Sequence, residues 1–154
     1  MLSTLHKFST STLTALVLAA VSNSAYTHDI NGIPIDAAGN NASATDLAQI
    51  VCFDNGNGKT EYLGIQIGDN SPPVPGLIVN VQISKDNKMT NISDNISADG
   101  KPSPFTYLRA GDGVYYVSVN KTAAGLRNFN LTFHCLTNTN EHTGTDIGGV
   151  LQIQ

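Results

Sequence analysis

The sequence predicts an all-β protein: an antiparallel β-sandwich of about seven or eight strands with one disulfide, preceded by a signal peptide. Three observations support this prediction: short segments of alternating apolar and polar residues, turns rich in Gly, Pro and Asn between them, and a pair of cysteines. Alternation with a period of two is typical of strands that bury one face. Short strands separated by such turns are typical of sandwiches.

The N-terminal residues 1–25 have the features of a secretory signal peptide. Lys7 supplies a positive charge, and residues 13–21 (LTALVLAAV) form an apolar run that is too short to cross a bilayer. Small residues follow, and they are compatible with cleavage after Ser24, Ala25 or Thr27. We therefore expect a secreted protein, extracellular or periplasmic, without a membrane span.

The mature chain of about 129 residues suits one domain with a single core. Loss of Lys7 with the signal leaves seven basic against twelve acidic side chains, a net charge of about −5. An acidic chain without a Lys/Arg cluster argues against nucleic acid and anionic lipid as partners. Charged residues make up 13% of the chain, while Asn, Ser, Thr and Gly are abundant, and this composition disfavours long helices.

Residues 26–46 form an N-terminal segment ahead of the sandwich domain, residues 47–154. Within it, residues 29–35 (DINGIPI) predict an edge strand, because Pro34 cannot donate a ladder hydrogen bond. Residues 37–46 (AAGNNASATD) are small and polar, and predict a flexible linker. Two arrangements are open: the strand pairs within its own chain, or it pairs with the sheet edge of another copy and builds oligomers.

The remaining strands are expected from the same alternation. They cover residues 47–53, 62–67, 77–84, 105–108, 114–119, 129–136 and 150–153. Residues 85–104 are polar and weakly patterned, and are expected to form a loop with at most a short strand near 89–92. The segment 54–58 (DNGNG) reads as a Gly/Asn hairpin turn rather than a calcium loop, because oxygen ligands do not recur at alternate positions. Residues 137–145 are expected to form a loop.

Alternation is cleanest in residues 129–136, where the apolar side chains and a cysteine share the inward face. Cys52 also lies on an inward face, and with Cys135 it completes the cysteine content of the chain. In an oxidising compartment the two are expected to form a disulfide. Closing a loop of more than eighty residues stabilises a fold by about 4–5 kcal/mol in chain-entropy models. The alternative, a metal thiolate, lacks any C-x-x-C motif.

The two strands around residues 114–119 and 129–136 are expected to form a hairpin across a Gly-containing loop. Residues 110–117 (AGDGVYYV) and 128–132 (NFNLT) resemble the last hairpin of pre-peptidase C-terminal domains, which are small secreted bacterial β-sandwiches and often non-catalytic. This resemblance of residues 110–132 implies a sandwich fold, and implies no ligand. The chain departs from that family in its cysteine pair.

No catalytic motif is present. The sequence lacks G-x-S-x-G, H-E-x-x-H and a phosphate-binding glycine–lysine loop, and its two glutamates, Glu61 and Glu141, are not marked as a facing pair. We therefore expect a protein that is not an enzyme and acts by binding a protein or surface partner, or by surface assembly.

Three histidines of the mature chain point to an alternative function, copper binding. His28 lies near the new N-terminus, His134 lies on the outward face of its strand, and His142 lies in the loop at 137–145. None is expected on a core face. Imidazole nitrogen is a preferred ligand of Cu(II), so these three residues are the candidate metal ligands.

The copper hypothesis depends on where the signal is cut. Cleavage after Ala25 gives the terminus Tyr-Thr-His, in which the amine, two backbone amides and the His28 imidazole can form a square-planar nitrogen site. Cleavage after Thr27 would make His28 the terminal residue, able to chelate copper together with His134 or His142.

Overall fold

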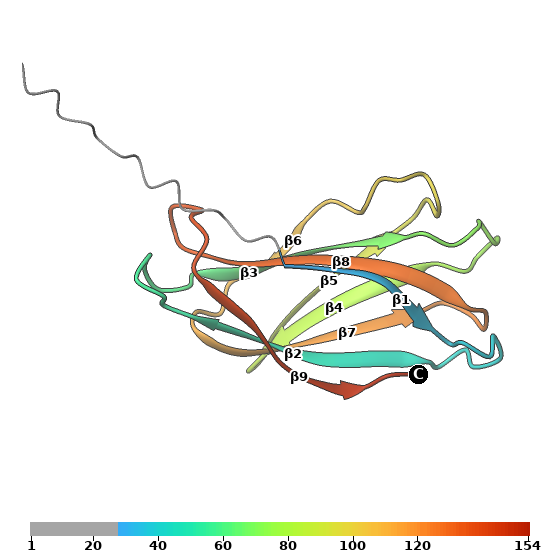
Figure 1. Ribbon diagram of the computed structural model, residues 1–154, viewed down its shortest axis with the longest axis horizontal. Coiled ribbons are helices and arrows are strands. Elements are labelled where there is room, and N and C mark those ends of the chain that lie inside the picture. The colour runs from blue at the N-terminus through green and yellow to red at the C-terminus, as the bar shows by residue number, and fades with distance from the viewer. Residues whose placement is uncertain (1–27) are drawn as a thin grey trace, which may run out of the picture.

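The computed structural model describes residues 28–154, which fold into the predicted antiparallel β-sandwich (Figure 1). The predicted signal peptide lies outside these residues. The nine strands are β1 (His28–Ile35), β2 (Thr45–Phe53), β3 (Tyr62–Asp69), β4 (Val79–Lys85), β5 (Lys88–Asp94), β6 (Thr106–Leu108), β7 (Gly113–Lys121), β8 (Arg127–Leu136) and β9 (Gly144–Gln152). Residues 28–154 contain no helix long and apolar enough to cross a membrane.

Two sheets face each other across one core. A four-stranded sheet has the order β1-β8-β3-β6, and a five-stranded sheet has the order β5-β4-β7-β2-β9. The inward side chains are those that the alternation predicts, because every second residue of a strand points to the same face. The core includes Ile50, Leu63, Ile65, Ile67, Val79, Val81, Ile83, Tyr115, Val117, Phe129, Leu131 and Phe133.

The N-terminal strand β1 is an edge strand, as predicted, and it pairs with β8 of its own chain. Ile30 and Ile33 are three residues apart, so a regular strand would point them to opposite faces. A bulge between them, with Gly32 at φ 66°, resets the register and brings Ile30 opposite Leu131 and Ile33 opposite Phe129. Both isoleucines therefore pack against the core.

Strand β5 is longer than the segment 89–92 that the sequence predicts. It pairs with β4 along its whole length, from Lys88 opposite Lys85 to Asp94 opposite Val79. A two-residue turn joins the two strands, and Asp86 adopts the positive φ, 53°, that such turns require. This hairpin raises the strand count above the expected seven or eight.

The predicted hairpin of β7 and β8 is wrong. Strand β7 pairs with β2 and β4 in the five-stranded sheet, whereas β8 pairs with β1 and β3 in the four-stranded sheet. The connection at residues 122–126 therefore crosses from one sheet to the other. Likewise, residues 54–58 join β2 to β3 in different sheets and do not form a hairpin turn. Alternation reports which face of a strand is buried, but not which strand lies beside it.

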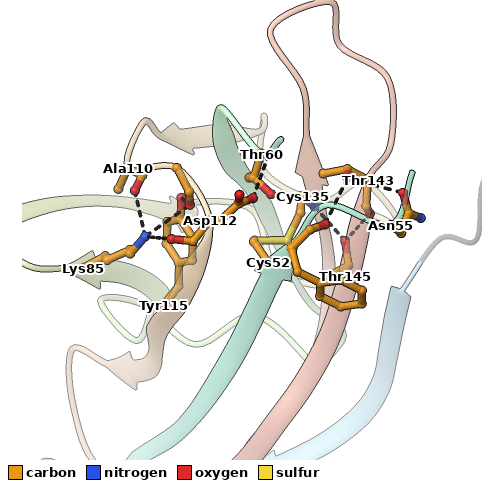
Figure 2. Close-up of a disulfide and its surroundings, with 12 residues drawn as sticks. Cys52, Asn55, Thr60, Lys85, Ala110, Asp112, Tyr115, Cys135, Thr143 and Thr145 are labelled. Carbon is orange, nitrogen blue, oxygen red and sulfur yellow. Dashed lines mark hydrogen bonds between the residues drawn. A yellow bond between two sulfur atoms is a disulfide. The ribbon is translucent and has the colours of Figure 1, made fainter. Parts of the chain in front are cut away.

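The predicted disulfide is confirmed. Cys52 on β2 and Cys135 on β8 are bonded, with their Cα atoms 5.6 Å apart, and both are buried (Figure 2). Since β2 and β8 belong to different sheets, the bond links the two layers through the core. The backbone amide of Cys135 donates to Thr145 Oγ1 at 3.0 Å, which also ties the start of β9 to this point.

Candidate functional site

The two sides of the sandwich differ in how they are closed. On one side β5 and β6 approach each other, and the hydroxyls of Thr90 and Thr106 form a hydrogen bond of 2.9 Å. The other side is bordered by the edge strands β1 and β9. These strands meet just past their C-terminal ends, where the Asp36 amide donates to the Gln154 carbonyl at 2.7 Å. We call the side bordered by β1 and β9 the open side.

Strand β9 and the residues after it expose unusually many large apolar side chains for a sheet edge. Val150 is 60% exposed and Ile153 is 68% exposed, and Ile147 and Leu151 are about half exposed. β9 pairs with β2 on one edge, and two register shifts interrupt that pairing. The sequence carried a signal that the strand prediction did not use: adjacent Val150 and Leu151 cannot both point into the core.

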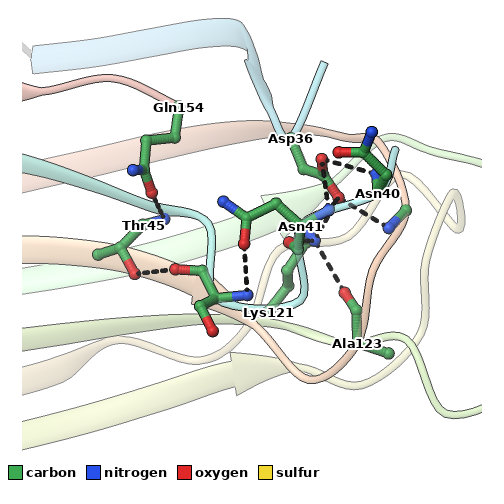
Figure 3. A network of polar contacts seen from close by, with 9 residues as sticks. Asp36, Asn40, Asn41, Thr45, Lys121, Ala123 and Gln154 are labelled. Atoms are coloured by element: carbon green, nitrogen blue, oxygen red, sulfur yellow. Dashed lines mark hydrogen bonds and ion pairs between the residues drawn. The ribbon is translucent and has the colours of Figure 1, made fainter. Parts of the chain in front are cut away.

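The end of β1 is fixed by a buried ion pair. Lys121 Nζ donates to Asp36 Oδ2 at 2.7 Å, and to the carbonyls of Asn41 and Ala123 at 2.7 and 2.8 Å (Figure 3). The Asp36 carboxylate also accepts hydrogen bonds from the backbone amides of Asn40, Asn41 and Gly125. The start of the predicted linker at 37–46 is therefore held against the connection between β7 and β8.

Two of the three candidate metal ligands lie together. The rings of His134 and His142 are 4.4 Å apart between centroids, on the outer side of the four-stranded sheet. Burial, with a contribution from neighbouring His142, lowers the pKa of His134 to about 4, so its imidazole is neutral at physiological pH. The Nδ1 atom of His134 is buried and has no hydrogen-bond partner within residues 28–154.

His28 lies elsewhere, and the expectation that it avoids the core face is wrong. It is opposite Phe133 in the β1–β8 register, and the two rings stack with centroids 5.6 Å apart. Residues opposite each other in a ladder point to the same face, so His28 points to the inner side, away from His134. Within the described residues, no three His, Cys, Asp or Glu side chains form a group that could hold a metal ion.

Comparisons with protein-family models, with curated proteins and with solved structures gave no match for this chain. The resemblance of residues 110–132 to pre-peptidase C-terminal domains therefore stays a prediction.

Proposed function

We propose that this is a secreted, non-catalytic β-sandwich protein that acts by self-assembly, through its open side. The observation that supports this proposal is the exposed apolar edge of β9. An edge strand presents unpaired backbone N–H and C=O groups, and apolar side chains along it favour pairing with another strand.

The edges differ in the features that prevent such pairing. β1 carries Pro34 and a bulge, β5 begins with Lys88, and β6 is three residues long. By contrast, residues 144–154 contain no proline, lysine or arginine. The bulges of β9 limit how long a paired segment can be, so the contact we propose is short and relies on its side chains.

A second copy of this chain is the partner that fits the edge best. An antiparallel pair of identical strands is related by a twofold axis, so the same edge serves both copies. Asp146 is the single charged side chain in residues 144–154. In an antiparallel pairing centred on Val150, the Asp146 side chains of the two copies do not face each other.

Exchange of the N-terminal strand between copies is a less favourable route to the same assembly. The strand's pairing with β8 within one chain makes exchange of β1 costly, because Ile35 is fully buried and Asp36 is bonded to Lys121. We therefore assign the contact to β9, with β1 beside it.

The test is sedimentation velocity on the mature chain over a wide concentration range. Wild type is expected to associate as concentration rises, and Val150→Lys is expected to stay monomeric, because edge lysines oppose strand pairing. Met89→Lys is the matched control: Met89 is equally exposed, at 60%, but lies on β5, which borders the opposite side. A wild type that is monomeric throughout, or a Val150→Lys variant that associates equally, contradicts the proposal.

A second candidate function is copper binding, and the contact between His134 and His142 favours it. Two imidazoles at 4.4 Å can direct nitrogen atoms to one ion, and imidazole is a good ligand for Cu(II). His28 would act separately, through the new N-terminus that cleavage creates.

Copper binding is tested by titrating Cu(II) into wild type, His142→Ala and His28→Ala, after sequencing the mature terminus. Weaker binding in His142→Ala supports the histidine pair, and weaker binding in His28→Ala supports the terminal site. Equal affinity in all three proteins removes both sites, and no binding in any of them removes copper as a function.

A further inference from the structure

The outer face of the four-stranded sheet carries a polar pocket that is separate from the apolar edge of β9. Its volume is about 200 Å³, and it lies between β1, β8, β3 and the loop that includes residues 100–102. Uncharged polar side chains dominate its walls: Asn31, Gln66, Asn70, Asn130 and Thr132. Asp29 and Lys101 contribute at the rim, and both are exposed.

The strand register brings three of these side chains into one row. Thr132 on β8 is opposite Asp29 on β1 and opposite Gln66 on β3. Neighbouring strands are about 4.8 Å apart, so the row places a carboxylate, a hydroxyl and an amide within one small ligand's length. Gly68, which is opposite Asn130, lets Pro102 of the loop approach the sheet closely, since a Cβ atom at Gly68 would lie 3.6 Å from the Cα atom of Pro102.

Hydrogen bonds inside the pocket orient its groups without using all of them. Thr132 Oγ1 donates to Asp29 Oδ1 at 2.6 Å, and the Gly32 amide donates to Asn130 Oδ1 at 2.8 Å. Within residues 28–154, the Asp29 Oδ2 oxygen and the Asn130 amide nitrogen therefore remain for a ligand. A carboxylate accepts and an amide both donates and accepts, so the pocket offers both kinds of partner.

Two aromatic side chains, Tyr107 and Phe105, lie beside the pocket on the same face, and we call this pair the aromatic shelf. Tyr107 is opposite Gly64, and a Cβ atom at Gly64 would lie 2.8 Å from Tyr107 Cε1, so the glycine lets the ring approach the sheet closely. Phe105 stacks on Tyr107 with centroids 6.0 Å apart and planes 19° apart. Tyr107 is 51% exposed. Gly64 and Gln66 are two residues apart on β3, which places the shelf about 7 Å along the strand from the pocket.

We propose that this pocket and shelf bind a neutral carbohydrate. Sugar hydroxyls both donate and accept hydrogen bonds, which matches the amides, the hydroxyl and the carboxylate of the row. The apolar C–H face of a sugar ring packs on an exposed aromatic ring, which Tyr107 provides. An anionic ligand fits poorly, because the exposed carboxylate of Asp29, which belongs to the row, would repel it.

The arrangement suits an oligosaccharide with one ring in the pocket and the next on Tyr107. Because the pocket is on the outer face of the four-stranded sheet, binding does not depend on assembly through β9. The two proposals can therefore fail separately.

The test uses the mature chain and neutral tetrasaccharides of glucose, galactose, mannose and N-acetylglucosamine, first on an array and then by calorimetric titration. Wild type is expected to bind at least one of them. Gln66→Ala and Tyr107→Ala are expected to lose about tenfold or more in affinity for it, and Tyr107→Phe to retain most of it, because the ring remains.

Tyr116→Ala is the matched control, since Tyr116 is a similarly exposed tyrosine on β7 of the other sheet. It is expected to bind as wild type does. The proposal is overturned if no neutral tetrasaccharide binds to folded wild type, or if Gln66→Ala and Tyr107→Ala, shown by circular dichroism to be folded, bind with unchanged affinity. If Tyr116→Ala weakens sugar binding as much as Tyr107→Ala does, the binding site lies elsewhere and the proposal is likewise overturned.

Discussion

Lys121 and Arg127 are two buried cations that lie on either side of one connection, residues 122–126, yet their surroundings differ. Lys121 ends β7, and its three N–H donors reach one carboxylate and two carbonyls. Arg127 begins β8, and its Nη1 donates to the Pro72 carbonyl at 2.5 Å, with the Asp69 carboxylate 3.6 Å away. Within residues 28–154, Arg127 Nε and Nη2 have no hydrogen-bond partner.

The difference shows that burial alone does not decide how far a charged side chain stabilises the fold. A buried ion stabilises a fold when its attraction and hydrogen bonds offset the loss of hydration. Lys121 meets that condition and joins the end of β1 to the connection between the sheets. Arg127 meets it in part, since each unpaired buried donor has a cost of about 1–3 kcal/mol.

The largest effect is expected for Lys121→Met. This variant leaves the Asp36 carboxylate buried without its cation, and breaking a buried pair in this way costs about 3–5 kcal/mol. Urea denaturation at neutral pH measures the loss. Lys88→Met is the control: Lys88 is exposed and donates to one carbonyl, that of Arg109, so its effect is expected to stay within about 0.5 kcal/mol. Equal effects of the two substitutions would contradict the role given to Lys121.

A smaller and pH-dependent effect is expected for Asp36→Asn, because the amide oxygen can still accept from Lys121. The Lys121 ammonium holds the pKa of Asp36 well below its usual range. A lowered carboxyl pKa stabilises the fold above the unfolded-state pKa, about 4, and this contribution is lost as the pH falls through the lower folded-state value. The stability difference between wild type and Asp36→Asn should therefore be complete at pH 7 and decrease below about pH 4. A difference that grows on acidification would refute this assignment.

The smallest effect of the three is expected for Arg127→Met, about 1–2 kcal/mol. The variant loses the Pro72 hydrogen bond and the attraction to Asp69, but it also removes two unpaired donors. Asp69 keeps hydrogen bonds from the Ser71 amide and the Ser97 hydroxyl. Denaturation under the conditions used for Lys121→Met gives the comparison directly, and a loss as large as that of Lys121→Met would show that Arg127 is paired as well as Lys121.

The sequence by itself determined where most strands lie and which of their faces is buried, since both follow from a period of two along the chain. Strand β9 is an exception, because it spans Gly144–Gln152 and the sequence predicted 150–153. It also predicted the disulfide, because Cys52 and Cys135 lie on inward faces of a chain that is expected to be secreted. Even Lys121 and Arg127 continue the inward alternation of their strands, after Val119 and before Phe129. The alternation therefore predicts that both side chains are buried, although their charge argues for exposure.

Only the tertiary structure decided which elements are neighbours. The partner of Lys121 is 85 residues away, and the polar pocket draws its walls from β1, β3, β8 and a loop. Contacts between distant segments also decided three other features: the separation of β7 from β8, the inward position of His28 and the contact of His134 with His142. Alternation is a local property of one strand, whereas pairing, sheet membership and side-chain contacts depend on how distant segments share one core.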